Sequence, residues 1–131
     1  MVEQNKYNLL SEQIIGSAIE VHKALGPGLL ESAYESCLCH ELKLRDIPFE
    51  RQVELPVSYK GVKLDAGYRI DLVVNGLIIV ELKAVERLEA IHEAQLLTYL
   101  RLSNHWLGLL INFNVAQMRF GIKRLVSGTP K

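Results

Sequence analysis

Apolar residues recur every three or four positions in three segments of the chain, and this spacing predicts three amphipathic helices. The first runs over about residues 9–25, with Ser11 as a candidate N-cap. Gly26-Pro27-Gly28 ends it, because proline cannot continue a helix and glycine accepts the dihedral angles of a sharp turn. The second helix is expected over about residues 29–45 and the third over about residues 88–103.

Alternating or continuous apolar runs predict five strands in the rest of the chain. They cover residues 51–60, 63–74, 77–85, 106–113 and 117–126. Pro56 indicates an edge or a bulge in the first strand, because proline has no N–H to donate to a neighbour. Asn75-Gly76 is a typical hairpin turn, and the strand after it is nearly all apolar, as in a strand covered on both faces.

The order of these elements is helix, helix, three strands, helix and two strands, which indicates an α/β protein. The helix between the third and fourth strands predicts a right-handed crossover and therefore a parallel pair. The first three strands are expected to form an antiparallel meander. We therefore expect one domain over residues 1–131, with a mixed five-stranded sheet flanked by three helices.

The composition excludes several classes of protein. Fifteen Lys and Arg balance fifteen Asp and Glu, whereas a protein that coats polyanions is basic overall. Cys37 and Cys39 lie two apart on a predicted helix and cannot pair locally, which fits a reducing compartment. No apolar run reaches the ~18 residues that span a bilayer, and the first residues lack the apolar core of a signal peptide. We therefore expect a cytoplasmic protein without a membrane contact.

Three charged residues interrupt the apolar runs of the predicted hairpin. Asp71 lies within residues 70–74, and Glu81 and Lys83 lie in the following strand, two apart and so on one face. Two carboxylates beside an amine suit metal-assisted hydrolysis of a phosphodiester, because Mg²⁺ prefers carboxylate oxygens and lysine stabilises charge on phosphate oxygens. The alternative interpretation is a solvated ion pair on the face of the sheet.

The register of the hairpin decides whether Asp71 and Glu81 meet. A two-residue loop at Asn75-Gly76 pairs Asp71 with Val80, which leaves the two carboxylates on opposite faces. A metal site needs both of them on one face. We therefore predict a three-residue loop, Asn75 to Leu77, or a bulge between the two acidic residues.

Two of the helices carry polar residues on apolar stripes. Glu31 lies on the stripe of the second helix, where a carboxylate is costly without a partner, although the helix dipole alone also favours an acid near the start. Gln95 and Tyr99 lie four apart on one face of the third helix. The same face carries three apolar residues, Leu88, Ile91 and Leu102. That face is expected to point inward, where a glutamine needs hydrogen-bond partners unless it is half-buried at the flank of the helix.

Three motifs resemble those of the PD-(D/E)XK nuclease superfamily. Asp71 followed by Glu81-Leu82-Lys83 resembles its D…(D/E)xK core, and the glutamine and tyrosine of the third helix resemble the QxxxY element of its RecB-like members. Residues 28–34, with the sequence GLLESAY, match the motif that names the GxxExxY family, which is assigned to this superfamily. The resemblance spans about residues 26–126 and leaves the first helix, about residues 9–25, outside the core.

The resemblance implies a restriction-endonuclease-like core of helix, three strands, helix and strand that holds Mg²⁺ or Mn²⁺. Carried over to this chain, the metal ligands are the side chains of Asp71 and Glu81 and the backbone carbonyl of Leu82. Glu31, as the acid of the leading helix, binds the metal directly or through water.

The resemblance also implies roles for side chains around the metal. Lys83 positions or activates the attacking water, and Gln95 orients the site. Tyr99 and Tyr34 support the site or contact the substrate.

Three hypotheses for the function follow. The first is a Mg²⁺-dependent nuclease that acts on DNA, with RNA as the second candidate substrate. The second is a non-catalytic module on a nuclease fold that binds nucleic acid or a protein, and the third is a structural protein with an ion-pair network. Seven basic residues are available for a local nucleic-acid patch: Lys60, Lys63, Arg69, Arg87, Arg101, Lys123 and Arg124. A homodimer suits a domain this small if it cuts both strands of a duplex.

Overall fold

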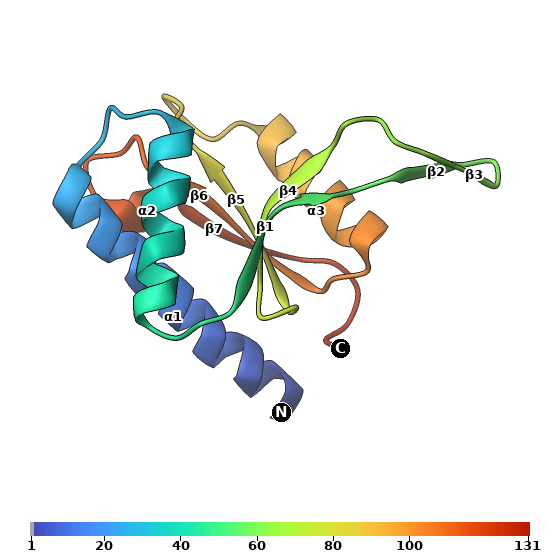
Figure 1. The fold of residues 1–131 in the computed structure, drawn as a ribbon, viewed down its shortest axis with the longest axis horizontal. Coiled ribbons are helices and arrows are strands. Elements are labelled where there is room, and N and C mark those ends of the chain that lie inside the picture. The colour runs from blue at the N-terminus through green and yellow to red at the C-terminus, as the bar shows by residue number, and fades with distance from the viewer. Residues whose placement is uncertain (1) are drawn as a thin grey trace.

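The structure, a computed structural model, describes residues 2–131, and Figure 1 shows its helices around a central sheet. The helices are α1 (Val2–Leu25), α2 (Glu31–Leu44), α3 (Ala90–Ser103) and a short 3₁₀ helix, η1 (Met118–Phe120). The strands are β1 (Phe49–Glu54), β2 (Val57–Tyr59), β3 (Val62–Leu64), β4 (Arg69–Val74), β5 (Ile78–Lys83), β6 (Leu107–Asn112) and β7 (Ile122–Val126).

Five of the strands form one mixed sheet in the order β1-β4-β5-β6-β7. β5 and β6 are parallel and are joined through α3, whereas the other neighbours are antiparallel. The predicted mixed five-stranded sheet with three helices is therefore confirmed, as are the parallel pair and the antiparallel arrangement before it.

Apolar side chains form two cores, one on each face of the sheet. α1 and α2 cover the face that carries the even-numbered residues of β5, and α3 covers the face with the odd-numbered ones. This double cover explains why the first half of β5, residues 78–80, is apolar on both sides. It also places Glu81 and Lys83 on the α3 face of the sheet.

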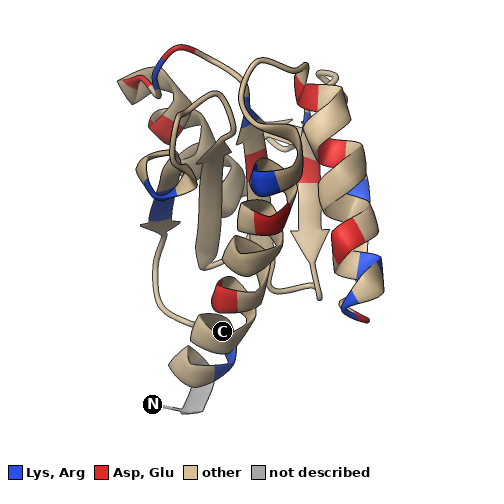
Figure 2. Ribbon diagram, turned by 90° about the vertical axis from the view of Figure 1, so that its left-hand side faces the viewer, with Lys and Arg blue, Asp and Glu red and all other residues tan. Residues whose placement is uncertain are grey.

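Charges of both signs are spread over the surface. Acidic and basic residues are interspersed along α1 and α2 in Figure 2, in keeping with fifteen residues of each sign in the chain. Within residues 2–131, no helix combines the length and the apolar character needed to cross a membrane.

α1 begins at Val2, earlier than the predicted start at residue 9. Ser11 is buried inside the helix, so its expected role as an N-cap was wrong. The first turns are polar in sequence, but Tyr7 anchors them because its buried ring meets Trp106 edge-on, with ring centroids 4.9 Å apart. Because Trp106 is so distant along the chain, the local apolar pattern does not reveal this contact.

The two strands predicted over residues 51–60 and 63–74 are each interrupted. β1 ends before Leu55-Pro56, and β2 and β3 pair with each other as a separate hairpin, residues 57–64, which we call the arm. The arm turns at Lys60-Gly61, whose φ angles are 49° and 80°. Figure 1 shows the arm extending away from the central sheet.

The last predicted strand, residues 117–126, was wrong in its first half, which forms η1 and not a strand. Gly121 joins η1 to β7, and any side chain there would collide with the carbonyl oxygen of Asn112. This close approach allows the Asn112 N–H to donate to the Gly121 carbonyl at 2.7 Å. The tight junction therefore bends the chain before β7 begins.

The loop between β4 and β5 has three residues, Asn75 to Leu77, because Val74 pairs with Ile78. Asn75 and Gly76 have φ angles of 51° and 65°, the left-handed conformation that Asn and Gly accept most readily. The predicted three-residue loop is confirmed, and the two acidic residues of the hairpin therefore share a face.

Tyr34 fixes the point where α2 begins. Its hydroxyl donates to the Gly26 carbonyl at 2.6 Å and accepts the Leu29 N–H at 3.1 Å. Its ring is fully buried and stacks on Phe113 with 4.5 Å between the centroids. One side chain thus joins the Gly-Pro-Gly turn, the helix and the core, and it sets the position of Glu31.

We predict that Tyr34→Phe lowers the free energy of unfolding by about 1–2 kcal/mol, because the stacked ring stays while two backbone groups lose their partner. Urea denaturation measures the change. Tyr59→Phe, on the exposed arm, is the matched control and should change stability by less than about 0.5 kcal/mol. Equal stability of the two variants would contradict this role of the hydroxyl.

Candidate active site

Asp71 on β4 and Glu81 on β5 lie where the regular pairing of the two strands stops. The last regular pair is Leu72 with Val80. Beyond it, the Asp71 N–H donates to the Glu81 carboxylate at 2.8 Å, and the Leu82 N–H donates to the Asp71 carboxylate at 2.9 Å. The structure therefore brings these two predicted site residues together, with each carboxylate held by the backbone of the opposite strand.

Burial and nearby negative charge make both carboxylates hard to ionise: Asp71 acts on Glu81, and Glu35 acts on Asp71. Burial, followed by the nearby charge of Asp71, raises the pKa of Glu81 to about 8. Burial also raises the pKa of Asp71, although the Leu82 N–H partly opposes that shift. Lys83 lowers the pKa of both groups, but its effect is smaller than that of burial. A further cation between the two carboxylates is therefore favourable.

The donor set fits a hard divalent cation. Mg²⁺ is usually held by one or two protein carboxylates and takes its remaining ligands from water and phosphate. Asp71 and Glu81 provide two carboxylates, and the backbone of Leu82 lies directly beside them. Among the side chains that the structure describes, no three His, Cys, Asp or Glu group closely enough to hold a metal ion. The residues therefore fit a site with two carboxylates and open positions.

Glu31 stands apart from this pair. It is the first residue of α2 and is exposed, and its charge makes the smallest of the contributions that raise the pKa of Glu81. Glu31 is therefore close enough for its charge to act on Glu81, but it does not form one group with the two carboxylates. Tyr34, which was expected to support the site or contact substrate, is fully buried; its hydroxyl bonds to the turn before α2, and its ring stacks on Phe113.

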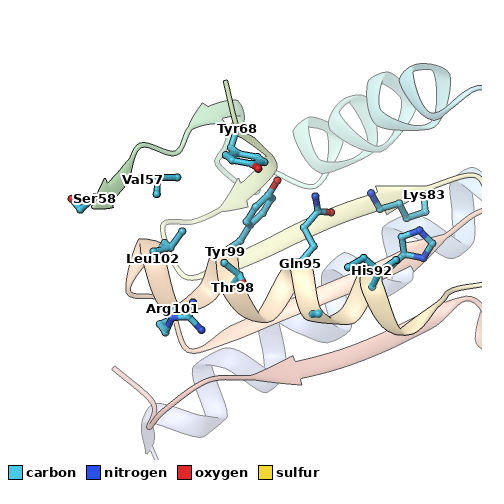
Figure 3. Close-up of a pocket in the computed structure, with 12 residues that line it drawn as sticks. Val57, Ser58, Tyr68, Lys83, His92, Gln95, Thr98, Tyr99, Arg101 and Leu102 are labelled. Atoms are coloured by element: carbon cyan, nitrogen blue, oxygen red, sulfur yellow. The ribbon is translucent and has the colours of Figure 1, made fainter. Parts of the chain in front are cut away.

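Lys83, Gln95 and Tyr99 line a cleft of about 740 Å³ between α3 and the arm (Figure 3). Lys83 extends from β5 toward Gln95, which projects from α3 into the same space. Burial, followed by the charge of Glu81, raises the pKa of the Tyr99 hydroxyl, so this tyrosine lies near the carboxylates as well as at the cleft. The cleft thus begins beside the Asp71–Glu81 pair.

The face of α3 that carries Gln95 points only partly into the core: Tyr99 is buried there and Gln95 is half-buried, but two of the apolar residues expected inside are not. Ile91 is 70% exposed, and both Ile91 and Leu102 line the cleft. The helix packs on the sheet through Leu96 and Leu100, which are fully buried. Gly108 on β6 permits this approach, because a Cβ there would lie 2.9 Å from a methyl carbon of Leu96. Of the three apolar residues expected inside, only Leu88 packs against that core.

Gln52, which the sequence analysis did not select, holds Asp71 from its other side and links it to Glu35, which was not selected either. The Gln52 side-chain amide donates to Glu35 at 2.8 Å and to Asp71 at 3.3 Å. Glu35 is buried and accepts two further hydrogen bonds from Arg51, at 2.9 and 3.2 Å. Glu35 follows Glu31 by one helical turn, a spacing that could have marked it. Nothing in the sequence of β1 marks Gln52, whose φ of 48° is unusual in a strand.

Comparison with family models identifies the class of protein. Residues 8–125 match the model of the PD-(D/E)XK nuclease superfamily, and the chain belongs to that superfamily. The mixed five-stranded sheet with three helices is consistent with the restriction-endonuclease-like fold. Neither the curated proteins nor the solved structures contain a match to the chain.

We predict that the metal-free protein loses stability as the pH rises from about 4.5 to about 8. Glu81 binds its proton more tightly in the folded state, so the folded chain carries more protons than the unfolded chain over this interval. Urea denaturation in EDTA at several pH values measures the slope.

Glu81→Gln removes the titrating group and should flatten this slope. Glu12→Gln, at an exposed position of α1, is the control and should retain it. A Glu81→Gln protein with the same slope as the unmodified chain would show that Glu81 is not the source.

Proposed function

We propose that this protein is a Mg²⁺-dependent nuclease that hydrolyses phosphodiester bonds in DNA, with RNA as the second candidate substrate. The main support is the placement of two carboxylates of raised pKa, Asp71 and Glu81, beside a cleft that Lys83 lines. Membership of the nuclease superfamily, whose members generally use divalent metal ions, supports the same chemistry.

In this proposal the side chains of Asp71 and Glu81 and the carbonyl of Leu82 hold the metal, and Glu31 reaches it through water. Mg²⁺ or Mn²⁺ supplies a Lewis acid for the phosphate and offsets the charge of the carboxylates. The backbone hydrogen bonds of Asp71 and Glu81 keep their oxygens in place before the metal arrives, so little reorganisation is needed. Gln52 adds a third restraint on Asp71.

Lys83 carries the positive charge on the cleft side of the site. Its ammonium group can donate to the attacking water and to a phosphate oxygen, which positions the water and stabilises charge that develops during hydrolysis. Gln95 projects toward Lys83 and orients it (Figure 3). Tyr99 supports this wall of the cleft with a ring that is mostly buried.

We also propose that the chain is a member of the GxxExxY group within the superfamily. The physical support is the role of the motif residues. Tyr34 fastens the turn before α2, and Glu31 begins the helix on the side where its charge acts on Glu81. The motif therefore determines where the helix acid lies relative to the carboxylate pair.

Two observations favour a second candidate function, a non-catalytic module that binds nucleic acid or a protein. In the part of the chain that the structure describes, no three potential metal-ligating side chains come together. The fifteen basic and fifteen acidic residues also give the chain no net positive charge to attract a nucleic-acid substrate, which favours the protein-binding form of this module. Metal binding separates the two functions, because only the nuclease requires it.

We predict metal-dependent cleavage of labelled oligonucleotides in Mg²⁺ or Mn²⁺ and none in EDTA. Lys83→Ala should reduce the rate by about 100-fold or more, with metal affinity retained, because it removes a group that acts on water or phosphate. Glu81→Gln and Asp71→Asn should lose both cleavage and metal affinity. Gel assays measure the rates, and titration calorimetry with Mn²⁺ measures the affinity.

Lys43→Ala is the matched control, because this lysine is exposed on α2 and should leave the rate unchanged. Calorimetry that detects no binding at millimolar Mn²⁺, with nucleic acid present, would favour the non-catalytic module. Equal rates in the Lys83→Ala and Lys43→Ala proteins would overturn the role given to Lys83.

A further inference from the structure

The cleft extends well beyond the carboxylate pair, and most of its lining has no part in holding a metal. α3 forms one wall, and the arm with Tyr68 forms the other (Figure 3). Its volume of about 740 Å³ lies in the range of ~300–1,000 Å³ that is typical of ligand sites. The residues that matter for a ligand are Tyr68 beside the arm, Lys83 at the end of β5, and Tyr99 and Arg101 on α3.

The charge of the lining differs from that of the whole chain. The protein has fifteen residues of each sign, but the lining holds Lys83 and Arg101 and no Asp or Glu. Most of the other lining side chains are apolar or aromatic. The cleft therefore suits a ligand that combines negative charge with a flat apolar part.

Tyr68 presents a rigid aromatic ring to this cleft. Its carbonyl accepts the Leu55 N–H and an Arg69 guanidinium N–H, both at 3.0 Å, so its backbone is fixed. Its ring meets the buried ring of Tyr99 edge-on at 6.0 Å, yet Tyr68 itself is 45% exposed. A ring that is held in place and still open to solvent is a suitable stacking surface for a base, and base–aromatic stacking tolerates any sequence.

A nucleotide has the two chemical features that the cleft selects. Its base is flat and stacks on aromatic rings, and its phosphate pairs with Lys and Arg. In a duplex each base face is covered by its neighbours, so an aromatic ring cannot stack on it. The lining therefore favours a strand whose bases are unpaired.

We propose that this cleft is a nucleobase-binding subsite for single-stranded nucleic acid, in which a base packs on Tyr68 while neighbouring phosphates lie toward Lys83 and Arg101. The inference rests on the proposed nuclease function, because it places the bound strand beside the Asp71–Glu81 pair. It adds that the substrate is unpaired at the site of cleavage.

Binding is tested separately from cleavage, by fluorescence anisotropy of a short labelled DNA strand in EDTA and again in Ca²⁺. An RNA strand and a blunt DNA duplex of the same sequence are the comparison ligands. We expect the duplex to bind at least about tenfold more weakly than a single strand. The DNA and RNA strands together show which sugar the subsite prefers.

Tyr68→Ala should weaken binding of the single strand by about tenfold or more, and Tyr68→Phe should restore it because the ring is kept. Tyr59→Ala removes an exposed tyrosine from the same arm but from outside the cleft, so it should bind like the unmodified protein. Arg101→Ala should weaken binding. It should also lower the slope of the logarithm of affinity against the logarithm of salt concentration by about one, the change expected for one lost phosphate contact. Photocrosslinking with an iodouracil strand should label Tyr68.

Three results would overturn the subsite. They are duplex binding as tight as single-strand binding, Tyr68→Ala binding equal to that of Tyr59→Ala, and no binding of any strand in either buffer. Failure of the nuclease proposal looks different, because strands would then bind through Tyr68 but remain uncut in Mg²⁺ and Mn²⁺.

Discussion

The exchange of hydrogen bonds between Asp71 and Glu81 is the constraint on which the site depends. Each carboxylate accepts a backbone N–H from the opposite strand, so side chains continue the ladder where regular pairing ends. The same bonds hold both carboxylates in a buried place, and burial raises the pKa of each, with the charge of Asp71 adding to the shift of Glu81. Lys83 offsets only part of the negative charge at this strand end, and a divalent cation would offset the rest.

Elements from three parts of the chain hold this strand end in place. β1 contributes Gln52, whose amide joins Asp71 to Glu35 of α2, and the left-handed φ of Gln52 is the conformational cost of that bridge. α2 is itself positioned by Tyr34, through the turn before it and the stack on Phe113. The packing of α2 thus restrains the Asp71 carboxylate in the sheet.

α3 separates the core from the cleft. Leu96 and Leu100 face the sheet, while Gln95 and Tyr99 stand where the cleft meets the carboxylate pair. Acidic side chains occupy the strand ends, and the cleft lining carries only cations and neutral groups. A chain with zero net charge therefore offers neighbouring regions of opposite character, one suited to a cation and the other to an anion.

The sequence by itself determined the order of the three helices and of the five strands of the central sheet, the parallel crossover and the three-residue loop at Asn75, but not the arm or η1. The element order and the crossover follow from local periodicity. The loop length follows from turn chemistry and from the requirement that Asp71 and Glu81 share one face. The tertiary structure alone decided that Tyr7 extends α1, that Gln52 bridges to Glu35 and that Ile91 faces the cleft. Each of these outcomes depends on a partner from another element, and a local pattern of apolar and polar residues cannot specify which element will pack beside it.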